Sequence, residues 1–132
     1  MSAIELVKTF LRTMEARDLA AADAMMAEDA LIIFPGGKRY TTQQEMVAHA
    51  RGRYQWVKKT FDTFDHFTRA DGAAVVYIMG TLYGVNKQQV AFEDIRYIDR
   101  FVIRNDKIIE QHVWNDLAES GVLHTTPKDD LP

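Results

Sequence analysis

The chain has 132 residues, 47% of them hydrophobic and 27% charged, which fits one domain with a packed core and an ordinary water-facing surface. The formal net charge of -3 disfavours nucleic-acid binding, which requires a basic face, and the lack of cysteine excludes disulfide and thiolate chemistry. No stretch approaches the roughly 20 apolar residues of a membrane span, and the first ten residues do not resemble a signal peptide. We therefore expect a cytoplasmic protein without a membrane or nucleic-acid partner.

The N-terminal part is predicted to be helical. Ser2 followed by Glu5 is a capping-box pattern, and apolar residues at helical spacing predict an amphipathic helix that ends at about residue 17. Asp18 can cap a second, shorter helix over residues 19–27.

A short strand and a third helix follow. Residues 30–34 form an apolar strand that Pro35-Gly36-Gly37 ends. Thr42 with Glu45 repeats the capping pattern and opens the third helix. The apolar face of this helix comprises Met46, Ala50, Tyr54 and Val57.

From about residue 60 the pattern changes to strands. Residues 60–69 are ambiguous because their phenylalanines fit neither period, whereas residues 73–84 predict a long strand and residues 91–103 alternate. After a turn at 104–106, residues 108–124 predict a closing strand and then a short helix. Short turns favour an antiparallel meander, and helices gathered before such a sheet make an α+β domain.

The expected architecture is a cone-shaped α+β roll. We expect one domain over residues 1–124, with residues 125–132 as a disordered tail. N-terminal helices would pack on the concave face of a strongly twisted, mostly antiparallel sheet. Such a cone can hold a small ligand.

The order of elements and the segment 97–117 resemble the SnoaL-like branch of the nuclear-transport-factor-2-like superfamily. The resemblance covers residues 2–123. It rests on a strand with Asp99-Arg100-Phe101, a tight turn before Lys107-Ile108, and a strand that ends in Trp114 and Asp116. One departure is the turn: the family usually has Asp-Gly, and this chain has Asn105-Asp106, where Asn tolerates the left-handed conformation.

The resemblance implies a pocket for a small apolar molecule, a homodimer through the outer face of the sheet, and no cofactor. The superfamily includes polyketide cyclases, ketosteroid isomerases, dehydratases, epoxide hydrolases and members with no chemistry, so it fixes no reaction. In SnoaL-type cyclases the acid/base is an Asp at the end of the closing strand, the place of Asp116. In ketosteroid isomerases a second acid lies near the place of Asp99. Their general base follows the first strand, where this chain has Pro35-Gly36-Gly37 and no carboxylate, which counts against isomerase activity.

Alternation along the closing strand places His112, Trp114 and Asp116 on one face. A carboxylate in an apolar pocket has a raised pKa that suits proton transfer, and His112 could relay the proton while Trp114 forms an apolar wall. These residues are therefore candidates for the polar floor or rim of the cone. Two alternatives stay open: Asp116 can cap the last helix, and His112 can be a satisfied half-buried histidine.

Asp99 shares a strand face with Tyr97 and Phe101, where an unpaired carboxylate would be costly. It must be protonated, functional or paired. Pairing is the favoured interpretation, with Arg51, Arg53 or another arginine as the partner.

Several apolar and aromatic side chains are candidates to line the cone. A tyrosine hydroxyl can polarise a carbonyl group, although tyrosines on amphipathic elements are mostly packing residues. The candidates are Met14, Phe34, Tyr40, Tyr54, Tyr83, Tyr97, Phe101 and Trp114. The four histidines show no H-E-x-x-H motif or close pair, so no metal site is expected.

Two functions are compatible with these observations. The first is a cofactor-independent enzyme of the cyclase, isomerase or dehydratase type, in which Asp116, helped by His112, moves a proton next to the carbonyl group of an apolar compound. The second is a non-catalytic ligand-binding or dimeric scaffold protein of the same fold. The two differ in whether the Asp116 carboxylate faces a cavity or the first amides of the last helix.

Overall fold

The computed structural model of the protein describes residues 1–50 and 52–127. The helices begin at the predicted caps: Ser2 Oγ accepts from the Glu5 N–H at 3.1 Å, and Asp18 accepts from the N–H of Ala21 at 3.2 Å. The helical elements are α1 (Ala3–Glu15), α2 (Leu19–Ala24), α3 (Gln43–Ala50), α4 (Leu117–Ser120) and the 3₁₀ turn η1 (Val122–His124).

The described strands form one seven-stranded sheet in the order β2-β1-β7-β6-β5-β3, and β4 also pairs with β5. The predicted meander is confirmed, because β4, β5, β6 and β7 pair in sequence and antiparallel. The pair β1–β7 is parallel, which makes the sheet mixed. The strands are β1 (Met26–Phe34), β2 (Lys38–Tyr40), β3 (Tyr54–Lys59), β4 (Thr63–Thr68), β5 (Ala74–Asn86), β6 (Ala91–Arg104) and β7 (Lys107–Asn115).

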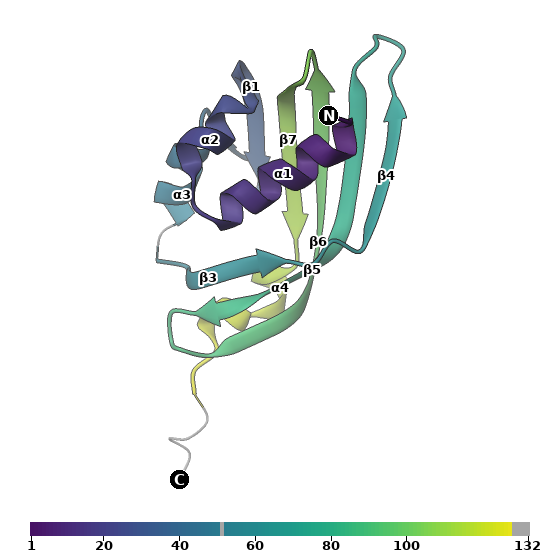
Figure 1. Cartoon of the computed structure of the whole chain (residues 1–132). Helices are drawn as coiled ribbons and strands as arrows, with labels where there is room; N and C mark the ends of the chain where they lie inside the picture. The colour runs from purple at the N-terminus through teal and green to yellow at the C-terminus, as the bar shows by residue number, and fades with distance from the viewer. Residues whose placement is uncertain (51, 128–132) are drawn as a thin grey trace.

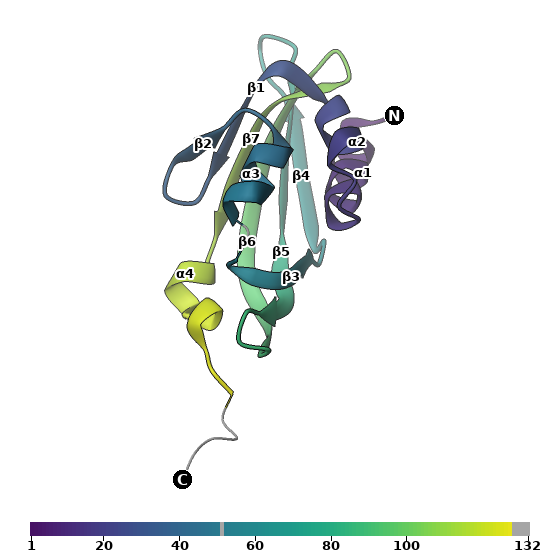
Figure 2. The same ribbon diagram turned by 90° about the vertical axis from the view of Figure 1, so that its left-hand side faces the viewer.

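Helices α1, α2 and α3 lie on one side of the curled sheet (Figures 1 and 2). This concave face carries the core, in which Phe10 of α1 packs edge-on against Phe101 of β6 with ring centroids 5.7 Å apart. Both side chains are fully buried. The predicted α+β class and the packing of the N-terminal helices on a strongly twisted sheet are confirmed.

The curl of the sheet depends on two glycines in β5. The first half of β5 pairs with β4 and the second half with β3, so the partner changes near Gly80. A Cβ at Gly80 would lie 2.2 Å from the Thr60 carbonyl oxygen, and one at Gly84 would lie 2.1 Å from that of Trp56. No side chain fits such an approach, so these glycines let the β3–β4 segment cross β5 closely.

The predicted third helix is wrong beyond Ala50. Residues Tyr54 and Val57, expected on its apolar face, belong to β3 and pair with Asn86 and Gly84 of β5. Gly52 has a φ of +96°, which a continuing helix cannot accept. Burial against the second half of β5 therefore overrides the helical spacing.

Other boundaries also differ from the prediction. The second helix ends at Ala24 because Met26 already pairs with Ile108 of β7, and the three-residue strand β2 was not predicted. The turn residues Asn105 and Asp106 do adopt left-handed φ values of 53° and 61°, as expected for Asn.

At the C-terminus, Thr125 is held by the Asn86 side chain, which donates to its carbonyl oxygen at 2.8 Å. The predicted disordered tail stays a prediction, and its part over residues 128–132 lies outside the described residues. Among the residues the structure describes, none of the helices has the length and apolar character to cross a membrane.

Candidate functional site

The concave face holds a small cavity between the C-terminal end of α1, helix α3 and strands β3, β5 and β7. Its volume is about 100 Å³. Its walls mix apolar side chains with charged and amide groups. The lining residues are Leu11, Met14, Glu15, Arg17, Phe34, Gln43, Met46, Tyr54, Val57, Lys59, Leu82 and Gln111.

A lysine–aspartate pair lies at this cavity. Lys59 of β3 lines the wall and pairs through its ammonium group with the Asp99 carboxylate of β6. The Asp99 side chain is fully buried, whereas that of Lys59 is 20% exposed. The Lys59 Nζ atom also lies 4.8 Å from the centroid of the Tyr97 ring. The expectation that Asp99 is paired is confirmed, but its partner is a lysine and not an arginine; Arg51, one predicted partner, lies outside the described residues.

Burial raises the pKa of the Asp99 carboxyl above its ordinary value, although the nearby Lys59 ammonium acts in the opposite direction. The second carboxyl oxygen, Oδ1, accepts no hydrogen bond from residues 1–50 and 52–127. Burial thus opposes the charged form of this carboxyl, and its Oδ1 atom is a buried acceptor without a partner among the described residues.

Glu15 ties the end of α1 to the strand that carries Lys59. Its Oε2 accepts from the backbone N–H of Lys59 at 2.9 Å, and its Oε1 accepts from Arg12 Nη1 at 2.8 Å. Thr60 follows Lys59 in the chain, and its carbonyl oxygen accepts a hydrogen bond from the Tyr97 hydroxyl at 2.6 Å. Burial is the main cause that raises the pKa of Tyr97. These contacts fix the backbone on both sides of the Lys59 amine.

Two buried glutamines form a second polar group in the cavity. Gln43 of α3 donates through Nε2 to Gln111 Oε1 of β7 at 2.8 Å. The backbone N–H of Gln43 donates to Asp23 at 2.7 Å, which anchors the start of α3. The predicted cap of α3 by Thr42 is confirmed, since its Oγ1 accepts from the Glu45 N–H at 3.0 Å.

Three of the residues predicted to contact a ligand, Met14, Phe34 and Tyr54, line the cavity. Tyr40 is not a lining residue but packs edge-on against Phe34, which is one. The other predictions fall outside the lining. Tyr97 and Phe101 are buried core residues, and Tyr83 packs against Trp56 beside a different, shallow depression.

The prediction that His112, Trp114 and Asp116 face the cone is wrong in its geometry. Asp99 and Val113 are register partners, as are Arg100 and His112, so His112 lies on the face opposite to Asp99. His112 stacks on the exposed Trp114 ring with centroids 5.6 Å apart. All three predicted side chains thus belong to the outer face of the sheet.

A β-bulge explains the reversal. After the turn, Ile103 pairs with Ile108, but Val102 pairs with Glu110, so Ile109 is an extra residue in β7. A one-residue shift turns every following side chain to the other face. In an uninterrupted hairpin, His112 and Trp114 would have shared the concave face with Asp99.

Asp116 does not act as the predicted side-chain cap of α4. It occupies the N-cap position of α4 but makes no side-chain cap bond; Asn115 Oδ1 instead accepts from the Leu117 N–H at 3.1 Å. The Asp116 carboxylate accepts from Arg96 Nε at 2.7 Å and is 39% exposed. It borders an open depression of about 490 Å³ that also includes Met79, Ile98 and Trp114.

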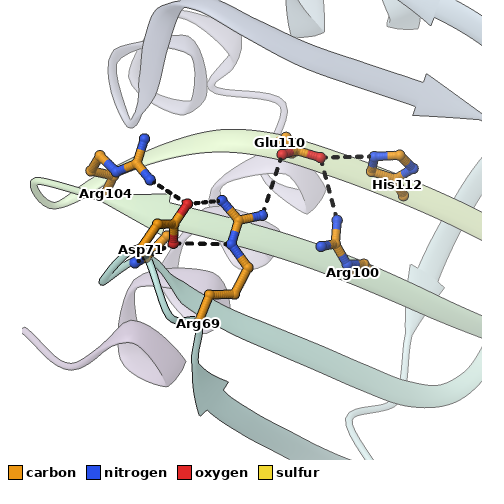
Figure 3. A network of polar contacts seen from close by, with 7 residues as sticks. Arg69, Asp71, Arg100, Arg104, Glu110 and His112 are labelled. Carbon is orange, nitrogen blue, oxygen red and sulfur yellow. Dashed lines mark hydrogen bonds and ion pairs between the residues drawn. The ribbon is translucent and has the colours of Figure 1, made fainter.

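The other end of the outer face carries a network of charges (Figure 3). Glu110 accepts from Arg100 at 3.3 Å and is 3.2 Å from His112 Nε2, while Asp71 accepts from Arg69 at 2.6 Å. The hydrogen bond from Arg69 is the largest cause that lowers the pKa of Asp71, and the same bond raises the pKa of Arg69. Among the described residues, no group of three or more potential His, Cys, Asp or Glu ligands is close enough to hold a metal ion.

Sequence reasoning missed Lys59, Gln43 and Gln111. The alternation of β7 carried a signal for Gln111, since the doublet Ile108-Ile109 breaks the period and permits a bulge. No local pattern identifies Lys59, because it lies between the predicted third helix and the ambiguous residues 60–69. The site residues come from three separate parts of the chain that only the fold brings together.

Comparison with known proteins identifies the family. The model of the SnoaL-like domain matches residues 7–111, and the chain therefore belongs to that family. A search of curated protein sequences finds no match.

Solved structures agree on the fold. An NTF2-like protein of unknown function from Burkholderia pseudomallei has a TM-score of 0.78 at 18% identity, covering 96% of this chain and all of the other. TerC, co-crystallised with polyporic acid, has a TM-score of 0.77 at 16% identity, with 92% and 98% covered. A candidate polyketide cyclase from Pseudomonas putida has a TM-score of 0.64 at 18% identity, with 91% and 96% covered. At these identities the likeness shows the fold alone.

Proposed function

We propose that this SnoaL-like protein binds a small carbonyl compound in the concave cavity and moves a proton at the carbon next to the carbonyl group. The observation that carries the proposal is the Lys59–Asp99 pair, in which Lys59 lines that cavity and Asp99 is fully buried. Neither a cofactor nor the outer-face residues His112 and Asp116 take part. The fold of TerC, a structural neighbour, accommodates the ligand polyporic acid, which supports ligand binding by this architecture.

The pair can exist as ammonium and carboxylate or, after transfer of one proton, as amine and carboxylic acid. Burial raises the pKa of Asp99, whereas the Lys59 ammonium acts in the opposite direction. In the second form, the Lys59 amine can accept a proton from the carbon next to a carbonyl, and the resulting ammonium group can stabilise the enolate oxygen. The proton then returns to a carbon or to a leaving hydroxyl group, which covers isomerisation, dehydration and aldol-type cyclisation.

The size of the cavity limits the ligand in this conformation. A cavity of about 150 Å³ holds benzene, so the 100 Å³ measured here suits a shorter molecule or one part of a longer one. Met14, Met46 and Arg17 line the cavity with unbranched, flexible side chains that can move to admit more. The small volume is also the observation that favours the second candidate function, a binding protein without catalysis.

Exchange of carbon-bound protons for deuterium tests the proposal without knowledge of the natural substrate. We expect the protein to accelerate exchange of the protons next to the carbonyl of 2-butanone in D₂O, followed by proton NMR. The variants K59M and D99N should abolish the acceleration, because each removes one member of the pair. The matched control D116N, which removes an exposed carboxylate on the other face, should retain it.

The results of the exchange experiment distinguish the catalytic function from the binding function. Exchange that depends on Asp116 and not on Lys59 contradicts the proposed site. Ketone binding without exchange in the wild-type protein leaves the binding function and removes the catalytic one.

We further propose that a second copy of the chain covers the outer face of the sheet. Figures 1 and 2 show α1, α2 and α3 on the opposite side, and Met79 and Trp114 expose nearly half of their surface on this face. The Arg96–Asp116 pair at the same depression offers opposite charges that two copies related by a twofold axis can exchange. The substitution I98E should yield a monomer in sedimentation velocity, whereas Q55E, an exposed site on β3, should not; an unchanged I98E assembly contradicts this interface.

A further inference from the structure

The two glutamines in the cavity have unused hydrogen-bonding capacity. Gln43 is fully buried and Gln111 is 3% exposed. Gln43 Oε1 accepts no hydrogen bond from any residue in the described part of the chain. Gln111 uses its oxygen to accept from Gln43, and within residues 1–50 and 52–127 no hydrogen bond employs its amide N–H groups. The pair therefore offers one free acceptor and free donors side by side.

Packing alone does not account for these amides. A buried amide without a partner is costly, and a leucine of similar volume would fill the same space on an apolar wall. The Gln43 backbone is already anchored by Asp23, so its side chain is not needed to start α3. Both residues belong to the lining of the cavity.

We propose that Gln43 and Gln111 form a subsite for a hydroxyl group of the ligand. A hydroxyl group both donates and accepts, so it can donate to Gln43 Oε1 and accept from Gln111 Nε2. A carboxylate or an ether oxygen only accepts and would leave Gln43 Oε1 unsatisfied. An ammonium group only donates and would leave the N–H groups of Gln111 unsatisfied.

The subsite lies next to the proposed reactive pair. Asp99 lies opposite Val113, and Gln111 is two residues from Val113 on the same face, so the Cα atoms of Asp99 and Gln111 are diagonal neighbours about 7–8 Å apart. A short molecule can therefore place a carbonyl oxygen near Lys59 and a hydroxyl group near the amides. The substrate class is a short hydroxylated aldehyde or ketone, an assignment that rests on the proposed function.

The test compares two probes of the same size, hydroxyacetone and 2-butanone, in which a hydroxyl group replaces a methyl group. Methionines labelled with ¹³C in the methyl group report the location, because Met14 and Met46 line the cavity while Met79 is on the outer face. We expect both probes to shift Met14 and Met46, with hydroxyacetone bound about tenfold or more tightly. The Q43L/Q111L variant should lose this preference and still bind 2-butanone.

Each of the other outcomes of this binding experiment overturns one part of the proposal. Equal affinity of the wild-type protein for the two probes overturns the hydroxyl subsite and leaves carbonyl binding in the cavity intact, and this comparison needs no variant. A preference that persists in Q43L/Q111L assigns it to other residues and overturns the role of the glutamines. No shift of Met14 and Met46 with either probe overturns the proposed cavity function, and the subsite with it.

Discussion

The substitution K59M isolates the electrostatic role of the buried pair. It removes the ammonium group but keeps an unbranched side chain of similar length, and it leaves the backbone N–H bond to Glu15 in place. Asp99 would then be a fully buried carboxyl without its ionic partner. An unpaired buried charge is more costly than protonation, so Asp99 should be neutral in the folded variant.

The loss of stability in K59M follows from the proton that the Asp99 carboxyl must take up when this variant folds. The ordinary pKa of the carboxyl is 3.8, and burial raises it in the folded protein. Stability is therefore fully present below about pH 4 and falls as pH rises through the folded pKa. Each pH unit in this window costs about 1.4 kcal/mol, so K59M should be less stable at pH 7 than the double variant K59M/D99N, in which no charge is buried.

Urea unfolding followed by the fluorescence of Trp56 and Trp114 measures this difference. We expect the gap between K59M and K59M/D99N to be larger at pH 7 than at pH 5, with a change of at most about 1.4 kcal/mol per pH unit. The control R96M removes the exposed partner of Asp116 and should cost less than about 1 kcal/mol at either pH. A gap that is small at pH 7, or that does not depend on pH, would refute the assignment of Asp99 as a desolvated carboxyl held by Lys59.

Three further predictions concern other parts of the fold. G80A should lower the free energy of unfolding by about 3 kcal/mol or more, because its Cβ would meet the Thr60 carbonyl, whereas G36A at an open turn should cost less; thermal denaturation compares them. F101A should cost about 3–5 kcal/mol in urea unfolding by removing the partner of Phe10 from the core, and a loss under 1 kcal/mol would contradict that packing. D71N should weaken the protein more at pH 7 than at pH 2, because Arg69 lowers the pKa of Asp71 and the resulting stabilisation is progressively lost as pH falls below the ordinary carboxyl pKa of 3.8; equal effects at both pH values would argue against the ion pair.

The sequence was sufficient for the class of fold because its local signals agree with the global structure. The caps at Ser2, Asp18 and Thr42 begin their helices as predicted, and the strands from residue 73 to 115 follow clear patterns. The failure at residues 54–57 has a different cause. Helical spacing there competed with pairing to β5, and a non-local contact of that kind leaves no trace in a short window.

The candidate site was predictable in part. Asp99 was identified because a carboxylate on an apolar strand face needs an explanation, and the structure supplies one in Lys59. His112 and Asp116 were placed on the wrong face because a single extra residue, Ile109, reverses the pattern of β7. The cytoplasmic location stays a prediction.

The proposed ligand site is the concave cavity and not the outer face of the sheet. A crystal structure of the protein soaked with hydroxyacetone tests this most directly. We expect density in the cavity, with the carbonyl oxygen within hydrogen-bond distance of Lys59 Nζ and the hydroxyl group at Gln43 and Gln111. Density beside Trp114 and Asp116 on the outer face, with the cavity closed by its own side chains, would contradict the account.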